Sequence, residues 1–107
     1  MQLRHGIDLI NLQRKELKNN ILAKRVLTKN EYQFYLNHSN SSWVLGVIFS
    51  CKEAVMKAFY LQYLYDDIEI KITKGPWLVH IKNQPTNLIL TTSFEDNLMI
   101  ASVIGHL

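Results

Sequence analysis

The sequence is poor in the features that mark disulfide-rich, secreted and membrane proteins. Its 107 residues include one cysteine, Cys51, two prolines and four glycines. A single cysteine excludes an internal disulfide and a cysteine metal cluster. No segment reaches the roughly 18 consecutive apolar residues of a membrane helix, and the N-terminal residues lack the pattern of a secretory signal. We therefore expect a cytoplasmic protein with no membrane partner.

The length fits one domain, residues 1–107, with enough apolar residues for a real core. The net charge is only +3, but residues 1–40 carry seven basic and three acidic side chains. This basic third indicates either an acidic partner or a solvated helix face without one. It has no Gly-rich or aromatic-interleaved basic tract, so we do not expect nucleic acid to be the partner.

The order of the predicted elements indicates an α+β fold. We expect a strand over residues 2–10 and then helical residues 12–27, broken near Asn19–Asn20 into a helix and a shorter second piece. Thr28 and Glu31 have the spacing of a capping box, which predicts a helix from Lys29 to Leu36. A long helix follows from Ser42 to about Tyr63. Four strand patterns complete the chain, "DDIEIKI", "WLVHI", "NLILTT" and "LMIASVI", so we expect the long helix to pack on an antiparallel sheet.

Three charged residues lie where apolar ones would be expected. Glu53 and Lys57 are four residues apart in the long helix and share one face, which Ser50 and Tyr60 extend. Such a pair is most often an exposed Glu–Lys pair that stabilises the helix slightly. Asp8, however, lies in an apolar strand and needs a cation or hydrogen-bond donors. Asp8 and Glu53 would suit Mg²⁺, with Lys57 facing the phosphates of a substrate.

The chain resembles the bacterial holo-acyl-carrier-protein synthases, a family of 4′-phosphopantetheinyl transferases. The resemblance rests on segments that occur in the family's order over nearly the whole chain. They are "GIDLINLQR", "KRVLTKNE", "FSCKEAVMKAF", "DIEI" and "LTTSFEDNLMIASVI". The combination of "KEAxxKA" with an upstream Gly-x-Asp is the more specific part.

The resemblance implies a Mg²⁺-dependent reaction of fatty acid biosynthesis. Phosphopantetheine would pass from coenzyme A to a serine of apo acyl carrier protein, releasing adenosine 3′,5′-bisphosphate. It also implies a homotrimer with active sites between subunits, and the 4′-phosphopantetheinyl transferase-like fold. By this resemblance, Asp8 and Glu53 would bind the metal, and the same two residues with Lys57 would be catalytic. Coenzyme A would be bound by Lys57, Gly75 and Ser93. The carrier protein would be bound by Arg14, Lys24 and Arg25.

Several positions depart from the family's pattern. Ile48 replaces an arginine, and Phe94 replaces the histidine of "SxSH". The segment after Phe59 has no glycine, and "KGP" at residues 74–76 replaces Gly-Lys-Pro. These changes motivate the alternative that the chain is a catalytically weakened carrier-protein binding module on the same fold.

Overall fold

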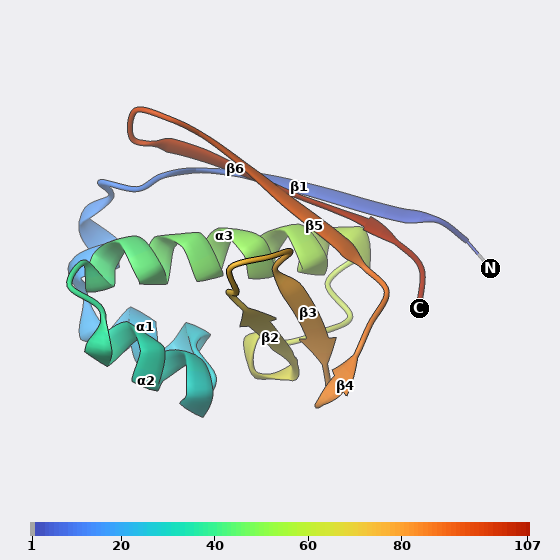
Figure 1. The fold of residues 1–107 in the computed structure, drawn as a ribbon, viewed down its shortest axis with the longest axis horizontal. Helices are drawn as coiled ribbons and strands as arrows, with labels where there is room; N and C mark the ends of the chain where they lie inside the picture. Colours follow the sequence, from blue (N-terminus) through green and yellow to red (C-terminus); the bar gives the residue numbers. More distant parts are fainter. Residues whose placement is uncertain (1) are drawn as a thin grey trace.

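The computed structural model describes residues 2–107. Three helices and six strands form an α+β arrangement in which α3 runs through the middle of the molecule (Figure 1). In chain order the elements are β1 (Arg4–Asn11), a 3-10 helix (Lys15–Lys18), α1 (Asn20–Val26), α2 (Lys29–Asn37), α3 (Ser41–Ala58), a 3-10 helix (Tyr65–Asp67), β2 (Ile68–Lys71), β3 (Leu78–Ile81), β4 (Gln84–Pro85), β5 (Ile89–Glu95) and β6 (Leu98–Gly105).

The strands form two antiparallel sheets of three strands each. The larger sheet has the order β1-β6-β5, and the smaller has the order β2-β3-β4. The first and last strands of the chain pair along their whole length, from Arg4 opposite Gly105 to Asn11 opposite Leu98. The fold class is as predicted, but the C-terminal strands divide between two sheets, because alternating hydrophobicity identifies a strand without identifying its partner.

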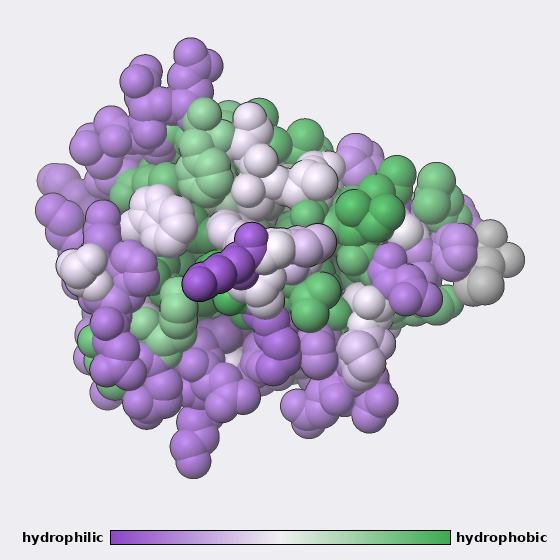
Figure 2. Space-filling view, viewed as in Figure 1, coloured by the Kyte–Doolittle hydropathy of each residue, from purple (hydrophilic) through white to green (hydrophobic). Residues whose placement is uncertain are grey.

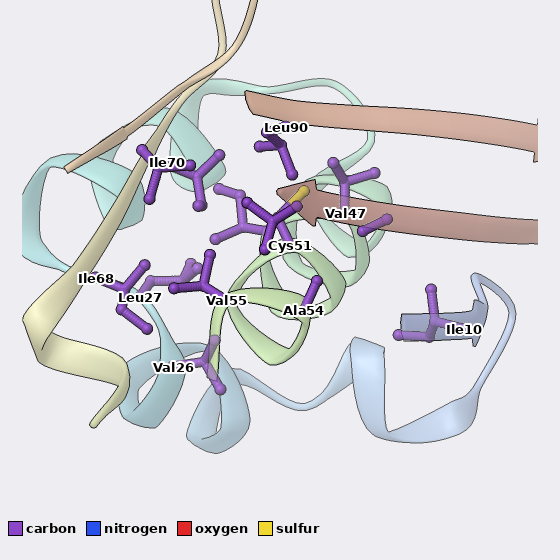
Figure 3. Close-up of a cluster of buried hydrophobic side chains, with 14 of the residues drawn as sticks. Ile10, Val26, Leu27, Val47, Cys51, Ala54, Val55, Ile68, Ile70 and Leu90 are labelled. Atoms are coloured by element: carbon purple, nitrogen blue, oxygen red, sulfur yellow. The ribbon is translucent and has the colours of Figure 1, made fainter. Parts of the chain in front are cut away.

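Helix α3 lies between the larger sheet and a second layer made of α1, α2 and the smaller sheet (Figure 1). Its apolar side chains meet residues from every part of the chain, and Figure 3 shows Cys51 and Val55 among Leu90, Ile68 and Ile70. Cys51, Val55, Ala58 and Phe59 anchor the C-terminal half of this helix, since all four are buried. The core therefore fixes which residues of α3 face β1.

Strand β1 lies directly against α3 because residue 6 has no side chain. A Cβ atom on Gly6 would lie 1.9 Å from the carbonyl oxygen of Ala54 and 2.8 Å from the backbone nitrogen of Ala58. Any larger residue would force the strand away from the helix. This contact brings Asp8, two residues further along the strand, beside the polar face of α3.

Local signals in the first forty residues predict the structure well. Asn19 caps α1 by accepting a hydrogen bond from the backbone of Ile21 at 2.8 Å, so the predicted break is confirmed. The helix expected before the break is wrong in length, since only the 3-10 helix Lys15–Lys18 forms there. The capping box is also present, because the Thr28 hydroxyl accepts from the Glu31 amide and the Glu31 carboxylate accepts from the Thr28 amide. Side chains that satisfy free backbone amides thus begin both helices.

The predicted C-terminal end of the long helix is wrong. Helix α3 ends at Ala58 rather than near Tyr63, and Tyr60 and Leu61 have φ values of 54° and 63°. This left-handed conformation costs a residue other than glycine about 1–2 kcal/mol, so the chain turns here against local preference. Tyr60 consequently leaves the helix face and stacks on Arg4, whose guanidinium carbon lies 4.8 Å from the ring centre.

Candidate active site

Two side chains of α3 hold the Asp8 carboxylate between β1 and the helix. The Ser50 hydroxyl donates to Oδ2 at 2.8 Å, and the Lys57 Nζ atom donates to Oδ1 at 2.9 Å. Lys57 also donates to the Ile7 carbonyl at 3.3 Å. The Asp8 side chain is only 14% exposed, whereas that of Lys57 is 51% exposed. The structure thus satisfies the partly buried acid with a cation that still reaches solvent.

Glu53 and Lys57 do not form the helix-surface pair that their spacing alone would favour. Among the described residues, the ion pairs include none between these two side chains. Lys57 turns to Asp8, and Glu53 accepts a hydrogen bond from the Tyr65 hydroxyl at 3.1 Å. Glu53 and Lys57 therefore do not form a solvated i,i+4 ion pair on the helix surface.

The Tyr65 phenol lies among the acids of this site. Burial raises the pKa of Tyr65 to about 12, with further contributions from the neighbouring Glu53 and Asp8 carboxylates, while the Arg25 guanidinium partly opposes them. The phenol thus remains protonated and able to donate at neutral pH. Tyr65 is a site residue that sequence reasoning missed, because nothing in the pattern around residue 65 indicates that its hydroxyl reaches α3.

The donor atoms suit a hard cation that keeps much of its own water. Among residues 2–107, no group of three or more His, Cys, Asp and Glu side chains is placed to hold a metal. Asp8 on β1 and Glu53 on α3 supply carboxylate oxygens from two elements that pack against each other. Mg²⁺ is commonly bound by one or two carboxylates together with water and substrate phosphates. Asp8 and Glu53 are therefore side chains of the chemical type that Mg²⁺ takes as ligands beside a phosphate substrate.

The three basic residues predicted to meet a carrier protein lie at the surface of the first two helical segments. Lys24 and Arg25 occupy the last turn of α1, and both are exposed. Arg14 precedes the first 3-10 helix and pairs with Glu16 at 3.2 Å, where both side chains are about half exposed. Exposed pairs of this kind contribute little stability, so these cations are available to a partner.

Gly75 and Ser93 are not part of the group formed by Asp8, Glu53 and Lys57. Gly75 lies in the exposed turn between β2 and β3. Ser93 lies opposite Ile100 in the larger sheet, whereas Asp8 lies opposite Ala101. Neighbouring positions along a strand point to opposite faces, so Ser93 is on the outer face and Asp8 faces α3. One chain alone does not bring these predicted residues together.

The two departures from the family's pattern are apolar side chains that each line a cavity. Ile48 is 1% exposed and lines a cavity of about 210 Å³. Phe94 stacks on Trp43 with ring centres 6.2 Å apart, beside a cavity of about 780 Å³. Neither side chain can replace the cation that the family's arginine or histidine offers to a phosphate.

Lys52, for which the sequence indicates no role, is a fully buried cation. Its Nζ atom lies 2.6 Å from Oε1 of Glu31 and donates to the carbonyls of Val26 at 2.6 Å and Tyr65 at 3.0 Å. Burial lowers the pKa of Lys52 and raises that of Glu31, and their attraction opposes both shifts. Glu31 also accepts from the Ile70 amide at 2.7 Å, so this pair links five elements: α1, α2, α3, the second 3-10 helix and β2.

Comparison with known proteins supports the same assignment. Residues 4–98 match the model of the 4′-phosphopantetheinyl transferase superfamily. A curated relative, the holo-[acyl-carrier-protein] synthase of Ureaplasma parvum, is 41% identical over 98% of this chain and 95% of its own.

Solved structures agree in fold. A holo-(acyl-carrier-protein) synthase of Bacillus anthracis, in complex with CoA (3′,5′-ADP), is 25% identical with a TM-score of 0.74, covering 94% of this chain and 93% of its own. Holo-ACP-synthase of Plasmodium yoelii has a TM-score of 0.78 at 21% identity, covering 97% and 96%. The α+β architecture, the family match over most of the chain and the curated relative lead to one conclusion: this chain belongs to the holo-[acyl-carrier-protein] synthase family of 4′-phosphopantetheinyl transferases.

Proposed function

We propose that the protein transfers 4′-phosphopantetheine from coenzyme A to a serine of apo acyl carrier protein, releasing adenosine 3′,5′-bisphosphate. The observation that carries this proposal is the meeting of Asp8 with the polar face of α3. Lys57 and Asp8 are 49 positions apart in sequence, yet their charged atoms are 2.9 Å apart. Membership of the family supplies the reaction class, and these side chains supply groups suited to it.

The reaction needs a base, a cation and a fixed phosphate. The serine oxygen attacks the β-phosphorus of the coenzyme A pyrophosphate, and the bond from that phosphorus to the adenosine-side oxygen breaks. Glu53, directly or through a water, accepts the serine proton. Lys57, half exposed beside Asp8, offsets the charge that gathers on the phosphate oxygens.

Asp8 and Glu53 are the residues that would hold Mg²⁺. The ion, when bound, neutralises charge on the pyrophosphate and orients it for in-line attack. Ser50 supports this role of Asp8 because its hydroxyl fixes one carboxylate oxygen. The mixed environment of Asp8, partly buried yet beside the exposed Lys57, suits a site that opens to a large phosphate substrate.

Arg14, Lys24 and Arg25 are proposed to dock the acidic carrier protein. All three are exposed, and Arg25 is near enough to Tyr65 to influence its phenol. This proximity supports a carrier-binding surface that ends at the catalytic acids. Charge complementarity of this kind mainly speeds encounter and selects the partner.

We also propose a homotrimer with each active site between two subunits. Apolar side chains are exposed over the larger sheet (Figure 2), and on its outer face they are Ile7, Leu9, Ile89, Leu98, Ile100 and Ile104. Soluble proteins rarely leave large apolar patches uncovered. A neighbouring chain on this face would also bring its own side chains next to Ser93, which lies on the same outer face.

The proposed location is the cytoplasm, where coenzyme A and acyl carrier protein would meet the enzyme. None of the helices in residues 2–107 has the length and apolar content needed to cross a bilayer. The location remains a prediction from the sequence.

Chromatography of the nucleotide product tests the proposed reaction. Incubation with apo acyl carrier protein, coenzyme A and Mg²⁺ should release adenosine 3′,5′-bisphosphate in step with loss of the apo protein. Omitting the carrier protein should remove this product, which separates transfer from coenzyme A hydrolysis. Release that is independent of the carrier protein would contradict the proposal.

The alternative is a carrier-protein binding module whose phosphate site is weakened. Its support is that Ile48 and Phe94 are apolar side chains, so neither of them can itself offer a positive charge to a phosphate. Under this alternative, carrier protein binds while coenzyme A does not. Calorimetry with each ligand distinguishes the two, because Mg²⁺-dependent coenzyme A binding favours the transferase.

A further inference from the structure

Tyr65 is the side chain that contacts Glu53 from outside its helix. It begins the 3-10 turn Tyr65–Asp67 that leads into β2, and its hydroxyl donates to Glu53 Oε1 at 3.1 Å. Among residues 2–107, the Glu53 carboxylate accepts this one side-chain hydrogen bond and forms no ion pair. Asp8, in contrast, has two partners, Ser50 and Lys57.

The Tyr65 ring and backbone are fixed independently of its hydroxyl. The ring lies against Phe49, with centres 5.9 Å apart and planes inclined by 41°. The backbone carbonyl accepts from Lys52 Nζ at 3.0 Å, and Lys52 is itself buried and paired with Glu31. The following turn is closed by Asp67, which accepts from the Leu64 amide at 2.9 Å.

Adjacent residues of α3 thus hold the two ends of Tyr65. Lys52 binds its carbonyl, and Glu53 receives its hydroxyl. A glutamate side chain has three rotatable bonds and loses rotamer freedom when it is fixed. Tyr65 therefore limits the rotamers of the Glu53 carboxylate. Tyr65 is itself held in place because its carbonyl is bonded to Lys52 of the buried ion pair.

We propose that Tyr65 is a positioning residue for the transfer reaction, occupying Oε1 of Glu53 so that Oε2 is presented to the metal and the acceptor serine. This inference rests on the proposed function. A carboxylate with one oxygen already bonded to a donor is oriented before its ligand arrives, which lowers the cost of forming the productive geometry. Tyr65 acts through Glu53 and needs no contact with the phosphate.

The test is Tyr65→Phe, which keeps the ring against Phe49 and the carbonyl that Lys52 binds. Tyr32→Phe is the matched control, because it also removes one hydrogen bond from a tyrosine hydroxyl. In the wild type, the Tyr32 hydroxyl donates to Asn20 at 2.9 Å in an exposed setting. Mn²⁺ binding, measured by electron paramagnetic resonance with coenzyme A present, reports the metal site without turnover. Steady-state kinetics with apo carrier protein and the urea midpoint complete the comparison.

Tyr65→Phe should weaken Mn²⁺ binding and lower kcat by about tenfold each, the usual effect of removing a group that orients a metal ligand. The KM for the carrier protein and the urea midpoint should stay close to the Tyr32→Phe values. Mn²⁺ affinity and kcat both equal to those of Tyr32→Phe would overturn the inference. A wild-type protein that transfers nothing would instead refute the proposed function, so the two failures are distinguishable.

Discussion

The Nζ atom of Lys52 lies 2.6 Å from Oε1 of Glu31, with side chains that are 0% and 2% exposed. The pair joins α2 to α3 one residue before Glu53, and it also ties in Val26, Tyr65 and Ile70 through hydrogen bonds. A buried ion pair contributes to stability only when its remaining donors and acceptors are satisfied. Here the backbone carbonyls and amides supply those partners.

Lys52→Met should lower the free energy of unfolding by about 3–5 kcal/mol, because it leaves the Glu31 carboxylate buried without a cation. Urea unfolding at a fixed protein concentration measures the change. Glu31→Gln combined with Lys52→Met should recover part of the loss, since the uncompensated charge is gone. A loss below about 1 kcal/mol in the single variant, the range typical of an exposed pair, would contradict the assigned role.

Stability should fall as the pH rises above about 8.5, the ordinary pKa of a cysteine. Burial raises the pKa of Cys51 to about 12 in the folded protein, with smaller effects from Glu31 and Asp8. The folded state keeps its proton where the unfolded state loses it, so this stabilising term is complete below pH 8.5 and is lost toward pH 12.

Cys51→Ala should flatten that dependence. Between pH 9 and 10 the thiol accounts for about 1.4 kcal/mol per pH unit, and alanine removes it. Urea unfolding of both proteins at several pH values gives the two slopes. Equal slopes of the unfolding free energy against pH above 8.5 would show that the thiol is not the group responsible. A difference between the two proteins that is the same at every pH reflects only the smaller volume of alanine.

Glu53→Gln should reduce transfer by at least about 100-fold, the lower end of the effect of removing a general base. Glutamine still accepts a hydrogen bond from Tyr65 but takes no proton. Glu16→Gln is the control, because it changes an exposed acid that pairs with Arg14. The variant's sedimentation should match that of the wild type, and near-normal activity would refute the role given to Glu53.

Arg25→Glu should raise the KM for the carrier protein on the order of tenfold, equivalent to about 1.4 kcal/mol. The salt dependence of kcat/KM should also become weaker, because a cation is lost from the docking surface. Lys82→Glu serves as the comparison, since Lys82 is an exposed cation in the turn between β3 and β4. Equal KM values for the two variants would rule out the proposed carrier surface around α1.

The sequence predicts the local elements of this fold better than their partners. The Asn19 break and the Thr28–Glu31 capping box depend on neighbours within three residues, and both occur as predicted. The division of the C-terminal strands between two sheets depends on contacts over long separations. The end of α3 depends on Tyr60 and Leu61 adopting left-handed backbone angles, which their residue types do not favour.

The candidate site shows the same division. Asp8 and Glu53 are identifiable as acids in apolar segments, and Gly6 permits the strand to approach the helix closely enough for Asp8 to reach Ser50. The sequence does not identify Tyr65 as a partner of Glu53, because the phenol arrives from a turn 12 residues away. The sequence around Lys52 likewise gives no sign of its role, because its partner, Glu31, is on another helix.

The intact mass of apo acyl carrier protein, after incubation with this protein, coenzyme A and Mg²⁺, tests the central claim most directly. A chelator arm and a Glu53→Gln arm accompany the wild type, and a competent transferase confirms that the carrier protein can be modified. The account predicts a mass gain of one phosphopantetheine with the wild type and Mg²⁺, with little or none in the other two arms. An unchanged carrier mass with the wild type, while the competent transferase modifies it, would contradict the account.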